Sequence, residues 1–298
     1  MIQQFIQKAE VLIESLPYIK SFSSKTFVIK YGGSTMEESI KRDIVHDIIL
    51  LKYIGINPVI VHGGGPEITA YLNKLNLKSE FVNGLRVTDK ATMEVVQMVL
   101  VGKVNQEVVS MINLYGGKAV GLTGKDGNII VSKKRLPETI YDTEGKTEKL
   151  VDLGFVGEIE RIDPKLIIGL CEHGYIPVIS PIGVGFDGES YNINADDVAS
   201  AVAQSLKAEK LIMLTDVDGI YEVAGNPATK ITSLTINKAQ QMIANSQITG
   251  GMIPKVRACI DAVSNGVKRT HIIDGKERHS ILLEIFTDKG IGTMVIED

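Results

Sequence analysis

The stretches FVIKYGGS (27–34) and VIVHGGGP (59–66) share one pattern, an apolar run that ends in consecutive glycines. Unbroken apolar runs of this length are typical of strands buried on both faces of a sheet. Glycines at the end of such a strand let backbone N–H groups approach an anion, and a following helix adds partial positive charge. One Gly-Gly turn is weak evidence, because tight turns use glycine freely. Two such turns in adjacent strand–helix units, one preceded by Lys30, predict an anion-binding crevice at the carboxyl edge of a parallel sheet.

Short apolar runs alternate with helical patterns along the rest of the chain. Buried strands are predicted at residues 25–30, 57–62, 117–124, 175–180, 210–217 and 269–274. Helices are predicted at 36–54, from Asp163-Pro164 to Gly174, and from Pro254 through Val263. This alternation predicts an α/β fold, a three-layer α/β/α open sandwich with a mainly parallel central sheet.

GVGFDG (183–188) matches a dinucleotide-binding fingerprint by spacing, but no helix opens directly after it, so we expect a hairpin or loop. The Gly-, Asp- and Asn-rich composition around it predicts a boundary between two lobes that share a continuous sheet. The expected division is an N-terminal helix at 1–24, an N-terminal lobe at 25–185 and a C-terminal lobe at 186–298.

Composition excludes several classes of protein. The chain has 298 residues, 44% of them apolar, which is enough for a sizeable core and excludes a disordered chain. The net charge of −4, without blocks of like charge, speaks against a nucleic-acid-binding protein. Cys171 and Cys259 have no metal-type spacing, so we expect neither a disulfide framework nor a zinc site, and a cytoplasmic protein. No unbroken apolar run approaches the roughly 18 residues that span a membrane.

The N-terminus shows helical periodicity. Its apolar residues fall on one face of a helix over residues 1–20: Ile2, Phe5, Ile6, Ala9, Leu12, Ile13 and Leu16. An amphipathic helix needs a partner for its apolar face. The partner is either its own domain or another subunit, and the periodicity does not decide between them.

Arg86 and a group of short polar residues are candidates for substrate binding. NGLRVTD (83–89) places Arg86 where it could clamp a carboxylate with two hydrogen bonds, although an isolated arginine is usually a solvated surface residue. YNINADDVA (191–199) places Asn192, Asn194 and Asp196 at the entrance of a helix. Ordinary N-capping would also account for them.

Lys255 is a candidate for binding an anion. ITGGMIPKV (248–256) places it in the first turn of a helix, where a lysine opposes the helix dipole. That local cost indicates a bound anion, while a solvated lysine remains the alternative. The five histidines form no recognisable ligand set, so no metal site is predicted.

These motifs resemble, in order and spacing, those of the amino acid kinase family. The shared segments are FVIKYGGSTM, VIVHGGGPEI, NGLRVTD, YNINADDVA, LTDVDGIY and ITGGMIPKV, between residues 27 and 256, with HIIDG and IGTMV near the C-terminus. The resemblance implies phosphorylation of the γ-carboxylate of N-acetyl-L-glutamate to N-acetyl-L-glutamyl 5-phosphate, a step of arginine biosynthesis. ATP would enter as its Mg²⁺ complex, with no tightly bound cofactor. The N-terminal lobe would bind the amino acid and dimerise, and the C-terminal lobe would bind ATP.

The resemblance also implies roles for single residues. Lys30 and Lys255 would neutralise charge on the transferred phosphoryl group, and Asp196 would hold both lysines. The substrate would contact Gly64, Gly65, Arg86, Asn192 and Asn194. ATP would contact Gly32, Gly33, Thr215, Asp216, Val217, Asp218, Gly219, Tyr221, Gly250, Gly251 and Met252.

The regulated members of this family are inhibited by arginine, and this chain resembles them. An N-terminal helix interlaces their dimers into a hexamer, a trimer of dimers, and residues 1–20 are similar to that helix. Tyr18, His271, Glu284 and Gly290 are similar to their arginine site. Relatives in oxygenic phototrophs also bind the PII signalling protein, and for a plastid-encoded member the compartment would be the stroma.

Two alternatives remain open. One is a glutamate 5-kinase-like enzyme, and the other is a non-catalytic regulator that binds nucleotide or arginine on the same fold. A carboxylate with a reference pKa of about 4.3 is already ionised at neutral pH, so this phosphoryl transfer needs no general base. The lack of a recognisable His/Ser/Cys catalytic motif therefore fits a kinase. The presence of Lys30, Lys255 and Asp196 argues against the non-catalytic alternative.

Overall fold

The computed structural model describes residues 2–32, 37–141, 148–223, 226–287 and 290–298. A mainly parallel sheet forms its centre, with strands in the order β16-β18-β17-β13-β1-β2-β10-β5. The neighbours pair in parallel except β17 and β18. In that order the bounds are Ser233–Thr235, Thr293–Ile296, Arg269–Asp274, Lys210–Thr215, Thr26–Tyr31, Asn57–His62, Ile176–Ser180 and Ala119–Thr123. All six predicted strands are confirmed, with ends that differ by at most two residues.

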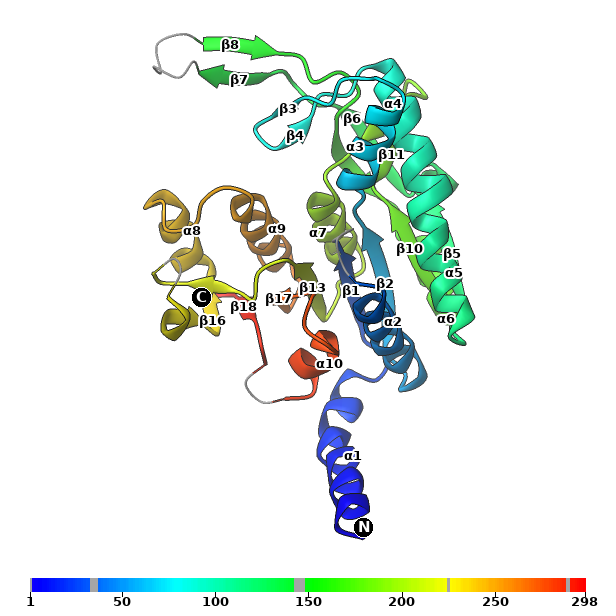
Figure 1. The fold of residues 1–298 in the computed structure, drawn as a ribbon, viewed down its shortest axis with the longest axis vertical. Coiled ribbons are helices and arrows are strands. Elements are labelled where there is room, and N and C mark those ends of the chain that lie inside the picture. The colour runs from blue at the N-terminus through cyan, green and yellow to red at the C-terminus, as the bar shows by residue number, and fades with distance from the viewer. Residues whose placement is uncertain (1, 33–36, 142–147, 224–225, 288–289) are drawn as a thin grey trace.

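Helices cover both faces of this sheet, which confirms the predicted three-layer sandwich (Figure 1). The α-helices are α1 (Ile2–Phe22), α2 (Glu38–Tyr53), α3 (Gly65–Lys74), α4 (Lys90–Gln97), α5 (Gln106–Leu114), α6 (Lys165–Glu172), α7 (Ala195–Ser205), α8 (Ile236–Ala244), α9 (Met252–Ser264) and α10 (Ser280–Ile285). A π-helical segment, η1 (Met98–Asn105), joins α4 to α5, and two short 3₁₀ turns are η2 (Asp126–Asn128) and η3 (Pro227–Thr229).

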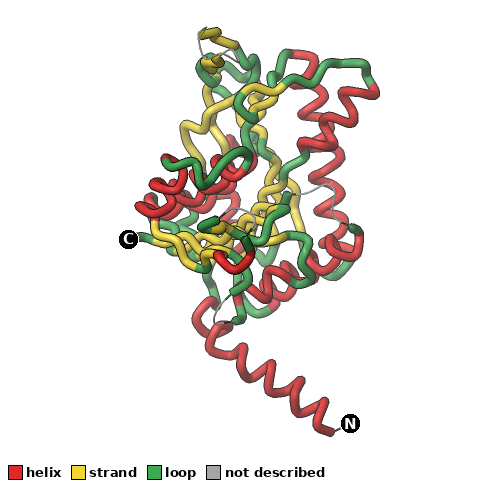
Figure 2. The backbone as a smooth tube through the Cα atoms, turned by 60° about the vertical axis from the view of Figure 1, so that its left-hand side comes forward, coloured by secondary structure: helices red, strands yellow, loops and turns green. Residues whose placement is uncertain are grey.

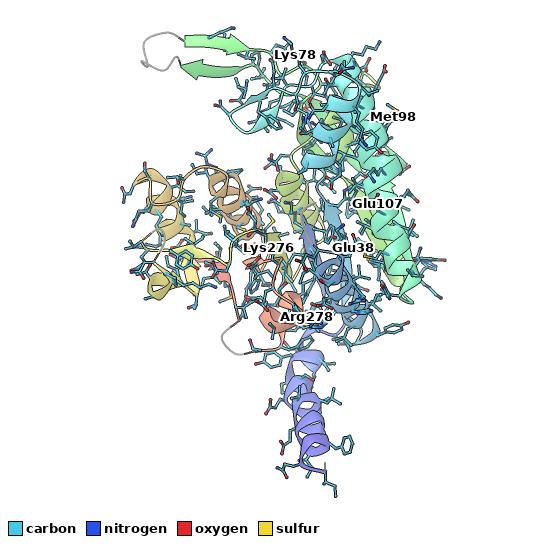
Figure 3. The ribbon with its side chains drawn as sticks, in the orientation of Figure 1. Glu38, Lys78, Met98, Glu107, Lys276 and Arg278 are labelled. Carbon is cyan, nitrogen blue, oxygen red and sulfur yellow. The ribbon has the colours of Figure 1, made fainter. Side chains whose placement is uncertain are left out.

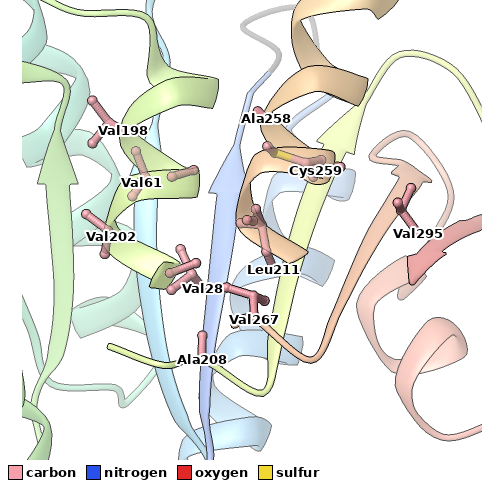
Figure 4. Close-up of a cluster of buried hydrophobic side chains, with 14 of the residues drawn as sticks. Val28, Val61, Val198, Val202, Ala208, Leu211, Ala258, Cys259, Val267 and Val295 are labelled. Carbon is pink, nitrogen blue, oxygen red and sulfur yellow. The ribbon is translucent and has the colours of Figure 1, made fainter. Parts of the chain in front are cut away.

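Alternate residues of the central strands enter two separate cores. On β1, Val28 packs with helices α6 to α9, while Phe27 and Ile29 pack with α2, α5 and α10. Figure 4 shows the first core, where Val28 of β1 and Val61 of β2 lie with side chains of α7 and α9. Because both faces are buried, the middle of each central strand is mostly apolar, which is the pattern that the sequence shows.

The remaining strands form small sheets beside the central one. One sheet has the order β12-β11-β6-β9, and three hairpins pair β3 with β4, β7 with β8, and β14 with β15. Their bounds are β3 Phe81–Val82, β4 Leu85–Arg86, β6 Ile130–Lys134, β7 Glu138–Tyr141, β8 Glu148–Val151, β9 Gly157–Ile162, β11 Ile182–Val184, β12 Ser190–Asn192, β14 Ile220–Tyr221 and β15 Lys230–Ile231. The hairpin predicted at 183–188 is confirmed as β11–β12. The predicted lobe boundary falls in its turn, and the central sheet continues across that boundary.

The continuous helical stretch Lys90–Leu114 is long and apolar enough to cross a membrane, by length and composition alone. Polar residues interrupt its apolar runs, so the search for an unbroken apolar run did not indicate this stretch. In the structure its buried face, which includes Val96, Leu100 and Ile112, packs against α2, α3 and the central sheet. A core helix of a folded domain meets the same criterion, and this packing accounts for its apolar face.

Helix α1 extends away from the body of the molecule (Figures 1 and 2). Apolar side chains along it remain largely exposed, among them Ile2, Phe5, Leu12 and Ile13. The predicted amphipathic helix is therefore confirmed, and within this single chain most of its apolar face has no covering surface.

Helix α9 begins earlier than predicted. It starts at Met252, and Pro254 is its third residue instead of its first. Proline is tolerated throughout the first turn because N–H groups there have no intrahelical acceptor, so the proline does not mark the start to the residue. Lys255 still lies in the first turn, as predicted. The glycines before it, Gly250 and Gly251, precede the helix.

Candidate active site

Three charged side chains meet at the carboxyl edge of the central sheet. Lys30, on β1, places its Nζ 3.0 Å from Asp196 Oδ1. Lys255, on α9, donates from its Nζ to Asp196 Oδ2 at 3.0 Å. Asp196 lies in the first turn of α7, and the side chains of Lys30 and Asp196 are only 10% and 8% exposed. The structure thus brings the three predicted catalytic residues together.

Burial and mutual charge set the protonation of this cluster. Burial is the largest influence on Lys30 and lowers the pKa of its ammonium, while the charge of Asp196 opposes that shift. Burial alone would raise the pKa of Asp196. The charges of Lys30 and Lys255 outweigh it, so the pKa of this carboxyl falls below its usual range. A carboxylate between two ammonium groups leaves one net positive charge in a water-poor site, which suits a phosphoryl group.

Gly32 lies directly beneath the Lys30 ammonium. A Cβ atom at this position would come 2.5 Å from Lys30 Nζ, so any side chain would push the ammonium away from Asp196. The same position lies beside the backbone of Leu214 on β13, the neighbour of β1. The glycine after β1 therefore leaves room for the Lys30 ammonium in its position beside Asp196. Gly33 lies outside the described residues.

The five predicted substrate-binding residues line one cavity of about 180 Å³. Its walls come from the turn after β2, the β3–β4 hairpin and the start of α7, and its lining includes Gly64, Gly65, Arg86, Asn192 and Asn194. Asn194 caps α7 by accepting from the Asp196 N–H at 2.7 Å, so the cap that forms the cavity wall also orients the first turn that carries Asp196. This is the N-cap alternative, and it coexists with a position in the site.

Two neighbouring hollows connect this cavity to the rest of the predicted site. One, of about 100 Å³, shares Gly63 and Gly64 with it and reaches Gly32. Another, of about 440 Å³, shares Asn194 and reaches Gly250. The largest described hollow, about 900 Å³, lies along β9, α7 and α9, and none of the predicted residues that the structure describes lines it. The positions of the predicted residues therefore favour the cavity of about 180 Å³ as the substrate site over the largest hollow.

Arg86 is held in place by the protein itself. Its guanidinium donates from Nη2 to Gly65 O and to Thr69 Oγ1, both at 2.9 Å, and from Nη1 to Ser79 Oγ. The guanidinium also lies over the Phe81 ring, 4.6 Å from its centroid. These contacts fix the guanidinium at the wall of the cavity. A bound carboxylate would share or replace part of them.

The segments predicted to contact ATP follow β13 and precede α9. Thr215, at the end of β13, donates from Oγ1 to Val217 O at 2.7 Å, which fixes the turn into Asp216–Gly219. The Asp218 carboxylate accepts from the Tyr221 hydroxyl and, at 3.1 Å, from Lys230. Gly250, Gly251 and Met252 form the entrance to α9. In the described ranges no group of three or more His, Cys, Asp or Glu side chains is arranged to hold a metal ion.

A second buried cluster lies at the other end of the central sheet. His271 Nδ1 and Glu284 Oε1 are 2.6 Å apart, and the backbone N–H groups of Ile291 and Gly292 donate to Glu284 Oε2. A Cβ at Gly290 would come 2.6 Å from the same carboxylate oxygen. Tyr18, on α1, packs edge-on against Phe286, which directly follows α10. The four residues predicted for arginine binding therefore lie in one region.

Lys210 belongs to this second cluster and was missed by the sequence analysis. Its Nζ lies 2.9 Å from His271 Nε2 and over the Phe22 ring of α1. Burial lowers the pKa of Lys210 to about 8. The available signal was a lysine that opens an otherwise apolar strand, where a buried charge needs a reason.

Helix α10, which carries Glu284, is fixed to α2 by charged contacts. Arg278 Nε donates to Asp43 Oδ2 at 2.6 Å, and His279 Nδ1 lies 2.7 Å from Asp47 Oδ1. Figure 3 shows Arg278 between these two helices. These contacts fix the start of α10, the helix that carries Glu284, against α2.

Comparisons with known proteins show the family of the chain. The model of the amino acid kinase family matches residues 25–274. The chain is 55% identical to the acetylglutamate kinase of Heliobacterium modesticaldum over 293 residues, which cover 98% of this chain and 99% of that protein. It is 52% identical to the acetylglutamate kinase of Halothermothrix orenii, with 99% of each chain covered.

Among solved structures, the chain is similar to N-acetylglutamate synthase from Neisseria gonorrhoeae complexed with coenzyme A and N-acetyl-glutamate. The TM-score is 0.81 and the identity 26%, over 97% of this chain and 63% of that one. The match therefore covers less than two thirds of the synthase.

Proposed function

The chain belongs to the amino acid kinase family, and we propose that it transfers the γ-phosphoryl group of ATP to the γ-carboxylate of N-acetyl-L-glutamate. The product is N-acetyl-L-glutamyl 5-phosphate, an intermediate of arginine biosynthesis. The observation that carries the proposal is the Lys30–Asp196–Lys255 cluster beside a cavity that contains a fixed guanidinium. The identity to acetylglutamate kinases over nearly the full chain supports the choice of acceptor.

The reaction brings one anion against another, so positioning and fixed positive charge do most of the work. Lys30 and Lys255 neutralise charge on the phosphoryl group in transfer. Asp196 holds both ammonium groups at 3.0 Å and remains ionised because of them. Backbone N–H groups of Gly64 and Gly65 supply further donors, and Arg86 attracts the carboxylate of the amino acid. ATP enters as its Mg²⁺ complex, and the ionised acceptor needs no general base.

The test is ADP release from MgATP with N-acetyl-L-glutamate, run beside glutamate, aspartate and UMP. We expect turnover with the acetylated substrate only. Turnover with glutamate would reassign the enzyme to the glutamate 5-kinase type and leave the mechanism in place. Nucleotide binding with no turnover on any acceptor would favour the non-catalytic regulator.

We also propose that arginine inhibits the enzyme at the second cluster. Glu284 is a buried acceptor suited to a guanidinium, and Lys210 is a cation suited to a carboxylate, so the pair is complementary to a zwitterionic basic amino acid. N-acetylglutamate synthase, on a similar fold, has been solved in complex with coenzyme A and L-arginine, with a TM-score of 0.79 at 25% identity.

Arginine titration of the kinase reaction tests this second proposal. Inhibition by arginine but not by lysine is expected, and Glu284→Gln should require at least about tenfold more arginine, because a charge-assisted bond is lost. Unchanged sensitivity in the variant would move the arginine site elsewhere.

A further inference from the structure

His62 is the last residue of β2, and it stands directly before the three glycines of the substrate cavity. Its side chain is completely buried and makes no contact with the cavity itself. Nδ1 lies 2.7 Å from the carbonyl oxygen of Gly63. On the other side of the ring, Nε2 lies 3.1 Å from Ser180 Oγ and 3.1 Å from Asn105 Nδ2.

These partners fix the tautomer of the ring. The Gly63 carbonyl can only accept a hydrogen bond, so Nδ1 carries the hydrogen. The Asn105 amide nitrogen can only donate, so Nε2 is the unprotonated acceptor. Burial lowers the pKa of His62 to about 4, and the imidazole therefore stays neutral at physiological pH.

The bond to Gly63 determines how the next peptide group is turned. A peptide unit is planar, and its C=O and N–H point in opposite directions. When His62 holds the Gly63 carbonyl, the N–H of Gly64 is directed away from the imidazole. Among the described residues, neither the Gly64 N–H nor the Gly65 N–H has a hydrogen-bond acceptor. Both are donors available to an anion in the cavity that these glycines line.

The surrounding chain is built to hold the imidazole in this orientation. Asn105, at the end of the π-helical segment η1, uses its second amide hydrogen to bond Val178 O on β10 at 2.9 Å. A Cβ at residue 121 would come 2.0 Å from Asn105 Oδ1, so only glycine at that position of β5 leaves room for the asparagine. On the same helix Leu100 packs against the Gly64 backbone. An irregular helical segment of this kind is frequent at functional sites.

We propose that His62 is a positioning residue for phosphoryl transfer, which fixes the Gly63–Gly64 peptide so that the Gly64 N–H faces the transferred phosphoryl group. The inference rests on the kinase activity proposed above. Asn105 and Ser180 hold the imidazole from behind, and Gly63 receives its hydrogen bond in front. The free rotation of a Gly-Gly peptide is thereby restricted before the substrates bind.

Two substitutions separate the two sides of the ring. In His62→Asn the amide nitrogen occupies the position of Nδ1, so the bond to Gly63 O is kept and the contacts to Asn105 and Ser180 are lost. In His62→Gln the amide lies near the position of Nε2, so those contacts are kept and the bond to Gly63 O is lost. If His62 had only a structural role, the two variants would lose activity in proportion to their loss of thermal stability.

We expect His62→Gln to lower kcat about 10- to 100-fold, with KM values for MgATP and N-acetyl-L-glutamate within about threefold, because misplacing a preorganised donor acts on the transition state. His62→Asn should retain kcat within about fivefold of the wild type. Equal kcat losses in both variants, or an unaffected His62→Gln, would overturn the inference. His173 is the matched control, because its Nδ1 also lies 2.7 Å from a backbone carbonyl, that of Gly169, at an exposed site directly after α6. His173→Gln should behave like the wild type.

Crystal structures of the two variants give a readout that is independent of turnover. The Gly63 carbonyl should remain turned toward residue 62 in His62→Asn and rotate away in His62→Gln. A wild type inactive on every acceptor would defeat the proposed function, while these structures would still decide whether His62 fixes the Gly63–Gly64 peptide. An unrotated peptide in His62→Gln would defeat the inference alone.

Discussion

Lys30 and Lys255 contact different oxygen atoms of the Asp196 carboxylate, and each supplies one positive charge to the site. We expect Lys30→Ala or Lys255→Ala to lower kcat about 100- to 1000-fold, as removal of a charge-stabilising donor does. The KM for MgATP should change much less, because the lost interaction acts mainly in the transition state. Steady-state kinetics on variants with native circular dichroism check this. Lys238→Ala, an exposed position on α8, is the control. Unchanged kcat in either lysine variant would remove the residue from the mechanism.

The buried His62 makes the stability of the protein sensitive to acid. Its pKa is about 4 in the folded protein and about 6.5 in an unfolded chain. Between these values the unfolded state binds the proton and the folded state does not, so stability is lost as pH falls from about 6.5 to 4, by at most about 3 kcal/mol. Urea unfolding of the wild type and His62→Asn at pH 7.5 and 4.5 measures the difference. A smaller acid loss in the variant is expected, and equal losses would contradict the assignment.

Among the structural elements, helix α1 exposes many apolar side chains and makes few contacts with the rest of this chain. Its apolar side chains are exposed along most of its length, and only its last turns, with Tyr18 and Phe22, touch the body. We expect the full chain to form an arginine-inhibited hexamer, and the chain without residues 1–20 to form dimers that arginine does not inhibit, since the deletion removes the packing surface and Tyr18 together. Analytical ultracentrifugation and arginine titration check both effects. A deleted protein that is still hexameric and inhibited would contradict the prediction.

Elements buried on two faces could be predicted from the sequence, and elements defined by long-range contacts could not. The strand at 57–62 is predicted to the residue, because its apolar run has no other stable environment. The short edge strand β16 and its neighbour β18 were missed because three or four residues carry too little pattern. At the site, Lys30 and Arg86 were found through the motifs around them. The contact of Lys210 with His271 and the contacts of His62 with Asn105 and Ser180 join residues at least 43 positions apart along the chain, and no local pattern encodes them.

On the scale of the whole molecule, the site is assembled from both halves of the chain, from one strand of the sheet and two helices that pack on it. Lys30 comes from β1, while Asp196 and Lys255 come from the C-terminal half. Ligands that bind only the folded chain stabilise it, and a ligand at about 100 times its Kd adds about 2.7 kcal/mol to the free energy of unfolding. We therefore expect MgATP and N-acetyl-L-glutamate each to raise Tm by several degrees, with UMP as the negative control in differential scanning fluorimetry. No shift with either substrate at saturation would contradict binding at this site.

The place of β1 in the middle of the sheet sets the order of events during synthesis. β1 pairs with β13, so that Val28 lies beside Leu211, a partner that leaves the ribosome more than 180 residues later. Until then one edge of β1 is unpaired, and such apolar edges promote aggregation of nascent chains. Pairings this distant along the chain also slow folding. A chain whose synthesis ends before β13 is therefore inactive and prone to aggregate. Completion of the C-terminal half is thus needed for both catalysis and solubility.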